Sequence, residues 1–182
     1  MSGTNTMYEK WFRGYTTLIL FLFACAGCST VSVTPNLSIL NKVSVLIKGP
    51  IQYDGKSEYL PRTISEGSIS EYGLTFRFTT TEAQERSGWD VLALFNPLTL
   101  FGFPTGDLTS TVTGRLEILK ETAIIKSYTA TCVQKASKGI YYGENFSQLR
   151  RKGLLAVRDN IETQMSQDRE FLEKAESKAF LQ

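Results

Sequence analysis

The spacing of apolar residues in this chain of 182 residues changes near residue 145, and that change constrains the fold more than any other feature. Before it, residues 108–118 alternate between apolar side chains on one face and mainly threonines on the other. Strict alternation is typical of an antiparallel strand with one buried face. After it, apolar residues recur every three or four positions from Phe146 to Met165, which predicts a helix with one apolar stripe.

Shorter patterns of the same kind complete the expected architecture. Further strands are predicted at residues 43–47, 74–79 and 123–133, with a break around Lys120 and Glu121. Strands followed by a C-terminal helix predict an α+β fold, in which the helix covers one face of the sheet. We expect a small antiparallel sheet of about four to five strands. The long amphipathic helix is expected over about residues 145–178 and packed on that sheet.

The first 28 residues have the order of a secretory signal. Lys10 and Arg13 precede an apolar run at residues 18–24, small residues follow, and then comes Cys28. A basic start, a short apolar centre and a small-residue exit are the three parts of a signal peptide. A spanning helix needs roughly 20 apolar residues, so this run is too short to remain as a membrane anchor. Met7 is an alternative start to Met1.

The end of this leader, Ala24-Cys25-Ala26-Gly27-Cys28, resembles the lipobox of bacterial lipoproteins. The resemblance implies cleavage between Gly27 and Cys28 and attachment of lipid to the Cys28 thiol, usually with a further acyl chain on the new amino end. Cys25 departs from the pattern, which prefers leucine there. The resemblance covers only the leader and the first mature residue. Two or three acyl chains hold a protein firmly to a membrane, whereas one chain holds it marginally.

Two other outcomes for the leader stay open. Ala24-Cys25-Ala26 also fits an ordinary signal peptidase, which would release a soluble chain that begins at Gly27. The leader can also remain as an uncleaved apolar helix. If lipidation occurs, Ser29 and Thr30 follow the cysteine where sorting rules treat Asp as an inner-membrane signal. That resemblance favours the outer membrane, with the domain facing the periplasm.

The expected organisation is therefore a leader, a tether and one domain. Residues 1–27 form the signal peptide, and residues 28–41, rich in Ser, Thr and Asn, form the tether. Residues 42–182 form a single periplasmic α+β domain, because the mature chain is long enough for one core. The mature chain has 18 basic and 17 acidic residues after loss of Lys10, Arg13 and Glu9. This balance gives no support for nucleic-acid binding, which needs a strongly basic face.

The sequence contains no histidine, which excludes Ser-His-Asp triads, Cys-His pairs and histidine-ligated metals. No metal or cofactor is expected beyond the covalent lipid on Cys28. Cys132 is expected to be a buried structural cysteine, as free cysteines usually are. A pair of carboxylates can still serve a glycosidase. The candidates outside the helix are Glu66, Glu71, Asp90, Glu121 and Glu144.

The segment of residues 89–104 is too apolar for an ordinary surface connection. One interpretation is a short helix and a buried turn that close one end of the sheet. The other is an exposed patch for a protein partner or the membrane, because large apolar surfaces usually mark such sites. The residues of this possible partner patch are Trp89, Phe95, Leu98, Phe101 and Phe103.

The order of sheet, apolar loop and helix is loosely similar to small uncharacterised lipoproteins of the bacterial envelope. The resemblance names no activity. The sequence therefore predicts a non-enzymatic, membrane-anchored module that binds or scaffolds another envelope component. Two alternatives stay open: a small histidine-free enzyme that acts on glycan or peptidoglycan through carboxylates, and a carrier of an apolar ligand.

Overall fold

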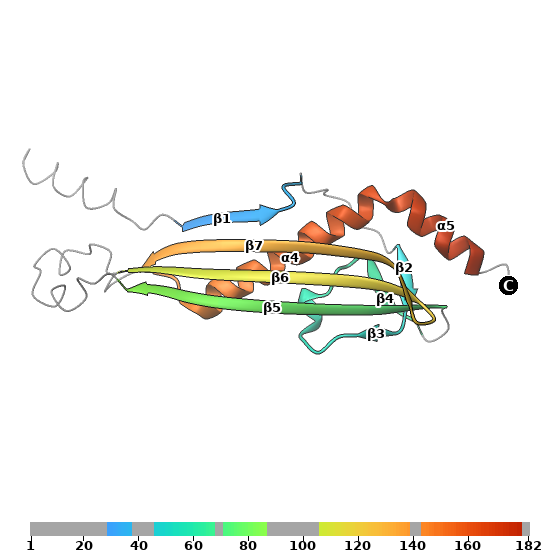
Figure 1. Cartoon of the computed structure of the whole chain (residues 1–182), viewed down its shortest axis with the longest axis horizontal. Helices are drawn as coiled ribbons and strands as arrows, with labels where there is room; N and C mark the ends of the chain where they lie inside the picture. Colours follow the sequence, from blue (N-terminus) through green and yellow to red (C-terminus); the bar gives the residue numbers. More distant parts are fainter. Residues whose placement is uncertain (1–28, 38–45, 68–70, 87–105, 139–142, 180–182) are drawn as a thin grey trace, which may run out of the picture. The chain divides into compact units, whose positions relative to one another are not determined.

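The computed structural model describes residues 29–37, 46–67, 71–86, 106–138 and 143–179. These residues form the predicted α+β fold, with strands first and helices last (Figure 1). The elements in chain order are β1 (Ser29–Thr34), β2 (Ile47–Gly49), β3 (Ile51–Gln52), η1 (Ser57–Tyr59), β4 (Ile64–Glu66), β5 (Tyr72–Arg86), β6 (Gly106–Lys120), β7 (Ala123–Lys138), α4 (Phe146–Gln167) and α5 (Arg169–Ala179).

The main sheet has five strands in the order β1-β7-β6-β5-β3, and β2 and β4 form a separate two-stranded sheet. The predicted number of strands is confirmed, but the sheet is mixed rather than antiparallel. Ile51 pairs with Leu74 in a parallel register, because the chain between β3 and β5 crosses over instead of turning back as a hairpin. The pair of β2 and β4 is parallel as well.

The three long strands contain the predicted segments and extend beyond them. Residues 74–79 lie within β5, residues 108–118 within β6 and residues 123–133 within β7. The predicted break is also present, and Glu121 adopts a positive φ of 57° in the tight connection from β6 to β7. Of the strand predicted at 43–47, the structure describes only the last two residues, and β2 begins at Ile47.

The residues directly after Cys28 form a strand, although their composition predicts the start of a tether. Ser29–Thr34 is strand β1, which lies beside β7 at one edge of the main sheet. Val33 packs against the core, and the Asn160 side chain donates a hydrogen bond of 2.6 Å to the Pro35 carbonyl. The β-branched residues of this segment favour a strand once an open sheet edge is available. The remainder of the proposed tether, from residue 38, lies outside the described residues.

The predicted C-terminal helix is present but is divided in two. Asn145 begins α4 with a reciprocal cap, in which its side chain accepts from the Gln148 N–H at 2.9 Å and Gln148 accepts from the Asn145 N–H at 3.1 Å. Such a cap satisfies two backbone donors that the helix start leaves unpaired. Asp168 ends α4, and α5 begins at Arg169. The predicted stripe is confirmed from its second member onward: Leu149, Gly153, Val157, Ile161 and Met165 are buried.

Two glycines let α4 lie close to the sheet. A Cβ atom on Gly114 of β6 would lie 2.5 Å from Val157 Cγ1 and 2.9 Å from a ring carbon of Phe78. A Cβ atom on Gly153 of α4 would lie 2.7 Å from Val112 Cγ2. Distances this short leave no room for a side chain, so both positions require glycine for the observed packing.

A buried polar side chain joins the sheet to the same stretch of helix. The Gln134 amide on β7 donates to the Leu149 carbonyl at 2.6 Å and accepts from the Gly153 N–H at 3.0 Å. Only 2% of Gln134 is exposed, so these bonds replace those it would make with water. The first half of α4 is therefore held by close packing and by contacts to its backbone.

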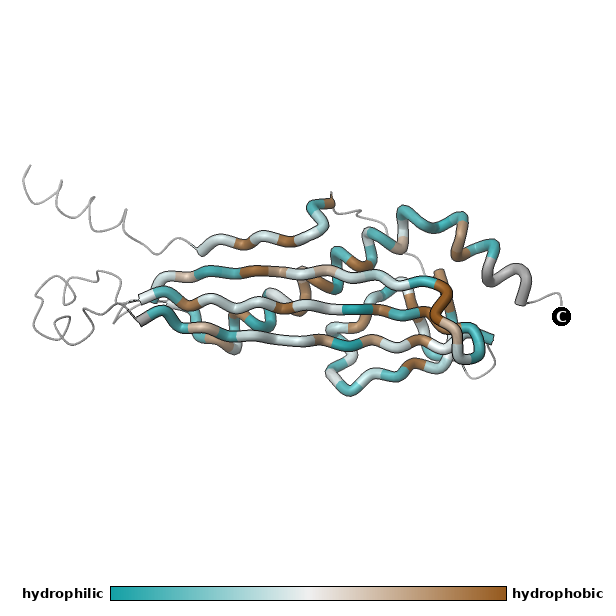
Figure 2. The backbone as a smooth tube through the Cα atoms, in the orientation of Figure 1, coloured by the Kyte–Doolittle hydropathy of each residue, from teal (hydrophilic) through white to brown (hydrophobic). Residues whose placement is uncertain are grey.

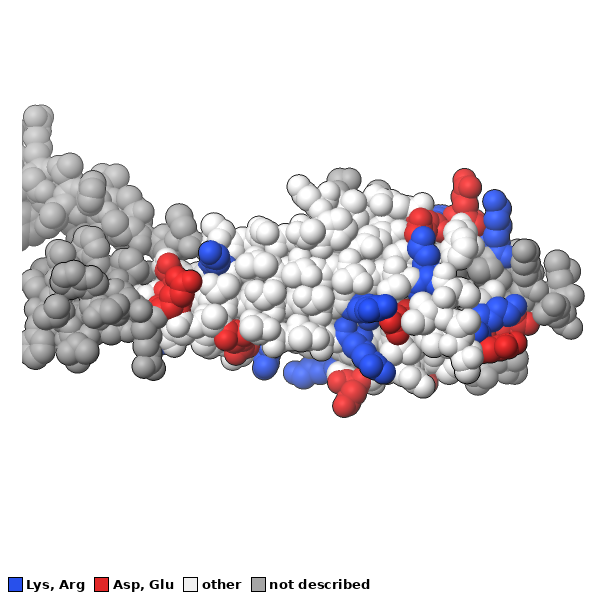
Figure 3. Space-filling model, in the orientation of Figure 1, with Lys and Arg blue, Asp and Glu red and all other residues white. Residues whose placement is uncertain are grey.

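The opposite face of the long strands is polar but poor in charge. The predicted threonines of β6 lie on this face, and the Thr113 hydroxyl is 3.0 Å from the Thr131 hydroxyl of β7. Figure 3 shows a broad uncharged area over the long strands, bordered by charged side chains. Figure 2 shows hydrophobic residues, coloured brown, near the connection between β6 and β7. Ile124, directly after this connection, is 52% exposed.

The chain divides into two compact units, which we describe separately. The larger unit comprises Val31–Ala83, Thr109–Gln134 and Asn145–Gln182 and contains the core under α4. The smaller unit comprises Met1–Thr30, Gln84–Leu108 and Lys135–Glu144. Its described residues are mainly the ends of four strands.

Candidate functional site

The lipidation site and the partner patch predicted from the sequence lie outside the described residues. This applies to the cleavage and lipidation positions, Gly27 and Cys28. It applies also to the whole possible partner patch: Trp89, Phe95, Leu98, Phe101 and Phe103. The structure does describe the residues that flank these segments in the chain.

Those flanking residues belong to the smaller unit, and they meet at one end of the main sheet. β1 starts at Ser29, β5 ends at Arg86, β6 starts at Gly106 and β7 ends at Lys138 (Figure 1). The order β1-β7-β6-β5 makes these strands consecutive neighbours. We call the described residues 29–30, 84–86, 106–108 and 135–138 the strand end.

Contacts within the strand end show that its strands adjoin. The Ser137 hydroxyl of β7 donates a hydrogen bond of 2.9 Å to Asp107 Oδ1 of β6. A Cβ atom on Gly106 would lie 3.0 Å from the Glu85 carbonyl oxygen of β5, so the two chain segments that flank residues 87–105 are in contact. The structure thus brings Ser29, which follows the predicted lipidation position, and the residues on both sides of 87–105 to the same end of the sheet.

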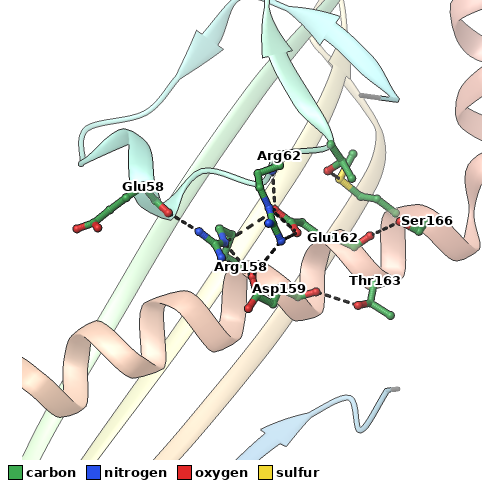
Figure 4. A network of polar contacts seen from close by, with 9 residues as sticks. Glu58, Arg62, Arg158, Asp159, Glu162, Thr163 and Ser166 are labelled. Atoms are coloured by element: carbon green, nitrogen blue, oxygen red, sulfur yellow. Dashed lines mark hydrogen bonds and ion pairs between the residues drawn. The ribbon is translucent and has the colours of Figure 1, made fainter. Parts of the chain in front are cut away.

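A second candidate is a polar cluster in the larger unit, between α4 and the segment before β4 (Figure 4). Glu162 Oε1 accepts from the Arg62 backbone N–H at 2.6 Å and from Arg62 Nε at 3.1 Å. Glu162 Oε2 accepts from a terminal nitrogen of the same guanidinium at 2.8 Å. The Glu162 side chain is only 3% exposed, whereas that of Arg62 is 61% exposed. We call this pair the clasp.

Neighbouring residues extend the clasp along α4. The Arg158 guanidinium lies 3.8 Å from Glu162 Oε1. It donates a hydrogen bond of 2.6 Å to the Asp159 carboxylate and one of 2.7 Å to the Glu58 carbonyl oxygen. The hydrogen bond and the charge of Glu162 raise the pKa of Arg62, so this arginine stays charged at all ordinary pH values. Both Glu162 oxygens already have donors, which makes this cluster an internal attachment of the segment before β4 rather than a reactive site.

Sequence reasoning found only part of the clasp. The spacing of Arg158 and Glu162 predicts a pair on the polar side of the helix, but Glu162 lies on the buried side. Its main partner, Arg62, is 100 residues away in the sequence. The position of Glu162 directly after Ile161 of the apolar stripe is a signal that could have indicated a buried carboxylate, but the sequence does not show which arginine would pair with it.

Cys132 and Tyr128 are two further ionisable residues that are buried in the larger unit, and we consider each as a reactive group. Cys132 is a free thiol with no exposed surface, as predicted, and burial raises its pKa. Burial also raises the pKa of Tyr128, and the nearby carboxylate of Asp168 adds to this shift. The Tyr128 hydroxyl makes no well-formed hydrogen bond with a described residue. A thiol and a phenol held neutral are poor nucleophiles, so neither forms a reactive centre.

The carboxylates considered for a glycosidase are distributed over separate elements. Glu66 ends β4, whereas Glu71 precedes β5 and forms an ion pair of 2.8 Å with Lys120. The hydrogen bond and charge of Glu71, with a smaller effect of Glu121, raise the pKa of Lys120. Asp90 lies outside the described residues. In the described ranges, no group of three or more Cys, Asp or Glu side chains is arranged to hold a metal ion.

No helix among residues 146–179, where the described helices lie, is long and apolar enough to cross a membrane. Comparisons of the chain with protein-family models, with curated proteins and with solved structures give no match.

Proposed function

We propose that the chain is the precursor of a lipoprotein of the bacterial cell envelope. A peptidase cuts between Gly27 and Cys28, Cys28 carries the lipid, and the α+β domain faces the periplasm, with the outer membrane favoured. The domain is a non-enzymatic module that binds or scaffolds another envelope component.

One observation carries this proposal: a short apolar run passes through small residues directly to Cys28. The run is long enough for a signal peptide and too short to stay as an anchor, so retention at the membrane requires the lipid. The position of β1 supports it. Strand β1 begins at Ser29, so cleavage before Cys28 removes the leader and leaves the whole strand in the mature protein.

The test is the intact mass of the mature protein from native membranes, compared with Cys28→Ala. We expect the unaltered chain to have the mass of residues 28–182 plus two or three acyl chains. Cys28→Ala should lose the acyl mass and remain as uncleaved precursor. Cys25→Ala and Cys132→Ala are matched controls, because each removes a thiol that the proposal leaves unmodified. An unmodified chain that begins at Gly27 would establish the secreted alternative instead.

The non-enzymatic role is supported by the arrangement of the polar side chains that the structure describes. The most connected of these, Arg62 and Glu162, bind each other inside the larger unit. Part of the outer face of the long strands is meanwhile uncharged (Figure 3), and the hydroxyls of Thr113 and Thr131 lie 3.0 Å apart on that face. Such a face suits contact with a partner better than charge-driven chemistry.

Complementation separates a scaffold from a carboxylate enzyme. In a strain that lacks the protein, we compare how well each variant complements the envelope defect of that strain. Variants with the amide at one of five positions should complement as well as the unaltered protein: Glu66, Glu71, Asp90, Glu121 and Glu144. Cys28→Ala should not complement. Failure of a folded, lipidated amide variant would favour the enzyme and contradict the scaffolding role.

A further inference from the structure

We infer that residues 77–83 of strand β5 pair with the same residues of a second copy of this chain, so that two main sheets join into one. We call this segment the β5 edge, and all of it belongs to the larger unit. The inference goes beyond the proposed function and does not depend on lipidation of Cys28.

Strand β3 covers only a short part of β5. It is the neighbour of β5 on the side away from β6, and it is two residues long. Its register with β5 ends at the pair of Gln52 and Thr75. Among the described residues, pairing on this side therefore stops at Thr75, whereas β5 continues to Arg86 (Figure 1). The β5 edge thus has a strand partner on one side only.

The chain that follows β3 turns beneath the sheet instead of continuing along β5. The ring of Tyr53 packs against that of Phe78, with the two centroids 6.3 Å apart. Phe78 points toward α4, because a Cβ atom on Gly114 would touch both Phe78 and Val157 of that helix. The helical turn η1, which comes next, also contacts α4. This part of the chain covers the helix side of the sheet rather than the β5 edge.

The backbone groups that point outward from the β5 edge belong to alternate residues. The Leu74 N–H donates to the Pro50 carbonyl at 2.9 Å, on the side of β3. Along a strand, the N–H and C=O groups of every second residue point to the same side. Phe78, Thr80 and Glu82 therefore direct their backbone donors and acceptors to this side, beyond the end of β3.

These three residues select one register for a second copy. An antiparallel pairing about a two-fold axis at Thr80 sets Thr80 opposite its own equivalent and Phe78 opposite Glu82. Each of these pairs exchanges two backbone hydrogen bonds. An axis at Phe78 would set Glu82 opposite Leu74, which β3 already pairs. An axis at Glu82 would set two carboxylates opposite each other, which is destabilising.

The side chains of the β5 edge are complementary to their own copy in this arrangement. The sequence is Arg-Phe-Thr-Thr-Thr-Glu-Ala. Antiparallel copies bring the Arg77 end of one segment beside the Glu82 end of the other, whereas parallel copies would bring like charges together. Thr79 lies opposite Thr81 of the second copy, and such threonine pairs stabilise a sheet. The segment contains neither proline nor lysine, the residues with which natural sheet edges commonly prevent pairing.

Covalent capture with Thr80→Cys tests the pairing, because the residue at the axis faces its own equivalent. Opposite residues of a hydrogen-bonded pair have Cα atoms about 5.5 Å apart, which suits a disulfide. The full chain is produced in a bacterial host, and copper phenanthroline is added to the unfractionated extract as oxidant. We expect a product of twice the mass of the chain, which reduction returns to the single chain.

Thr129→Cys is the matched control for this capture. Thr129 is also an exposed threonine, but it lies on β7, which has neighbouring strands on both sides. It should give little dimer. The unaltered chain has the same Cys25, Cys28 and Cys132 as both variants, so it shows any cross-link that these thiols form.

Exchange of charge at the axis separates pairing from folding. Thr80→Lys and Thr80→Glu each place like charges opposite each other, so each variant should be monomeric by native mass spectrometry in mild detergent. The unaltered chain should be dimeric. An equal mixture of the two variants should regain a dimer that contains one chain of each. Thr129→Lys and Thr129→Glu are the matched controls and should remain dimeric.

Several results would overturn the inference. One is an unaltered chain that is monomeric, and another is a Thr80→Cys product no more abundant than that of Thr129→Cys. Charged Thr80 variants that stay dimeric, or that are folded and do not recover on mixing, would place any dimer contact elsewhere. A disulfide from Thr80→Cys to a different protein would assign the β5 edge to that partner instead. If circular dichroism shows that the charged variants are unfolded, the disulfide capture alone decides.

Discussion

The two halves of helix α4 are attached to the rest of the larger unit in different ways. The first half is held by shape: Gly153 and Gly114 remove side chains so that helix and strand lie close together. The second half is held by charge, through the clasp between Arg62 and Glu162. Close packing uses neighbours from the adjacent strands, whereas the clasp fixes a distant and irregular segment. A single helix thus organises both the sheet and the chain that leads to β4.

The largest effect is expected from Arg62→Ala. This change leaves the Glu162 carboxylate buried with the Arg62 backbone N–H and the more distant Arg158. Only the Glu162 carboxylate is buried, and Arg62 is largely exposed, so we expect a cost at the lower end of the range for broken buried pairs, about 3 kcal/mol. Urea unfolding should show this loss in the free energy of unfolding. Glu162→Gln is the control, since it removes the buried charge but keeps an acceptor, and its cost should be clearly smaller. Equal costs would show that charge is not what attaches the second half.

Gly114→Ala tests the first half. The new methyl group overlaps Val157, and overpacking of this kind costs about 2 kcal/mol. We expect a lower midpoint of thermal unfolding, with normal secondary structure. Gly114→Ala combined with Val157→Ala should recover part of the loss, because the second change makes room for the first. No recovery in the double variant would mean that the close approach of helix and strand is not the cause.

Tyr128→Phe tests whether the buried phenol of Tyr128, which lies on β7 near Asp168 at the end of α4, makes the stability of the protein depend on pH. Folding raises the pKa of Tyr128, so the unfolded chain releases its proton first as the pH rises. The contribution of Tyr128 to stability should therefore be fully present below about pH 10 and decline above it, by up to about 1.4 kcal/mol per pH unit. The phenylalanine variant should lose less stability between pH 10 and pH 11 than the unaltered protein. Parallel pH profiles would contradict this role for Tyr128.

The smallest effect is expected from Arg169→Ala in α5. Its ion pair with Glu173 has the same chemistry as the clasp, at 2.6 Å, but both side chains are more than half exposed. Exposed pairs contribute at most about 0.5 kcal/mol, and salt screens them. The change should be near the limit of detection and absent in 1 M salt. A loss comparable to that of Arg62→Ala would remove burial as the explanation for the strength of the clasp.

The fold could be predicted where the pattern is local. Alternation identified β5, β6 and β7, and the stripe from Leu149 to Met165 identified the buried face of α4. The parallel pairing of β3 with β5 was missed because β3 has only two residues, too few to show any period. The division at Asp168 was missed because the helical spacing continues through it.

The candidate site was less accessible to prediction. Burial of Cys132 was predicted from the general tendency of free cysteines to be buried, whereas the clasp depends on a contact between residues 62 and 162 that no local pattern encodes. Residues 29–34 were expected as a tether because serine and threonine are common in loops. The same residues form a strand here, because an open edge of β7 is available to them.

That first strand has a consequence for the order in which the sheet is completed. β1 contributes six residues at the N-terminus of the domain, and its partner β7 follows about ninety residues later in the sequence. The edge of β7 is therefore unprotected until the two distant segments meet, and exposed sheet edges invite pairing between molecules. Lys126, Lys135 and Lys138 lie along β7. Lysines on a sheet edge disfavour such association, so the lysines of β7 should reduce aggregation of the chain before β1 has paired with β7.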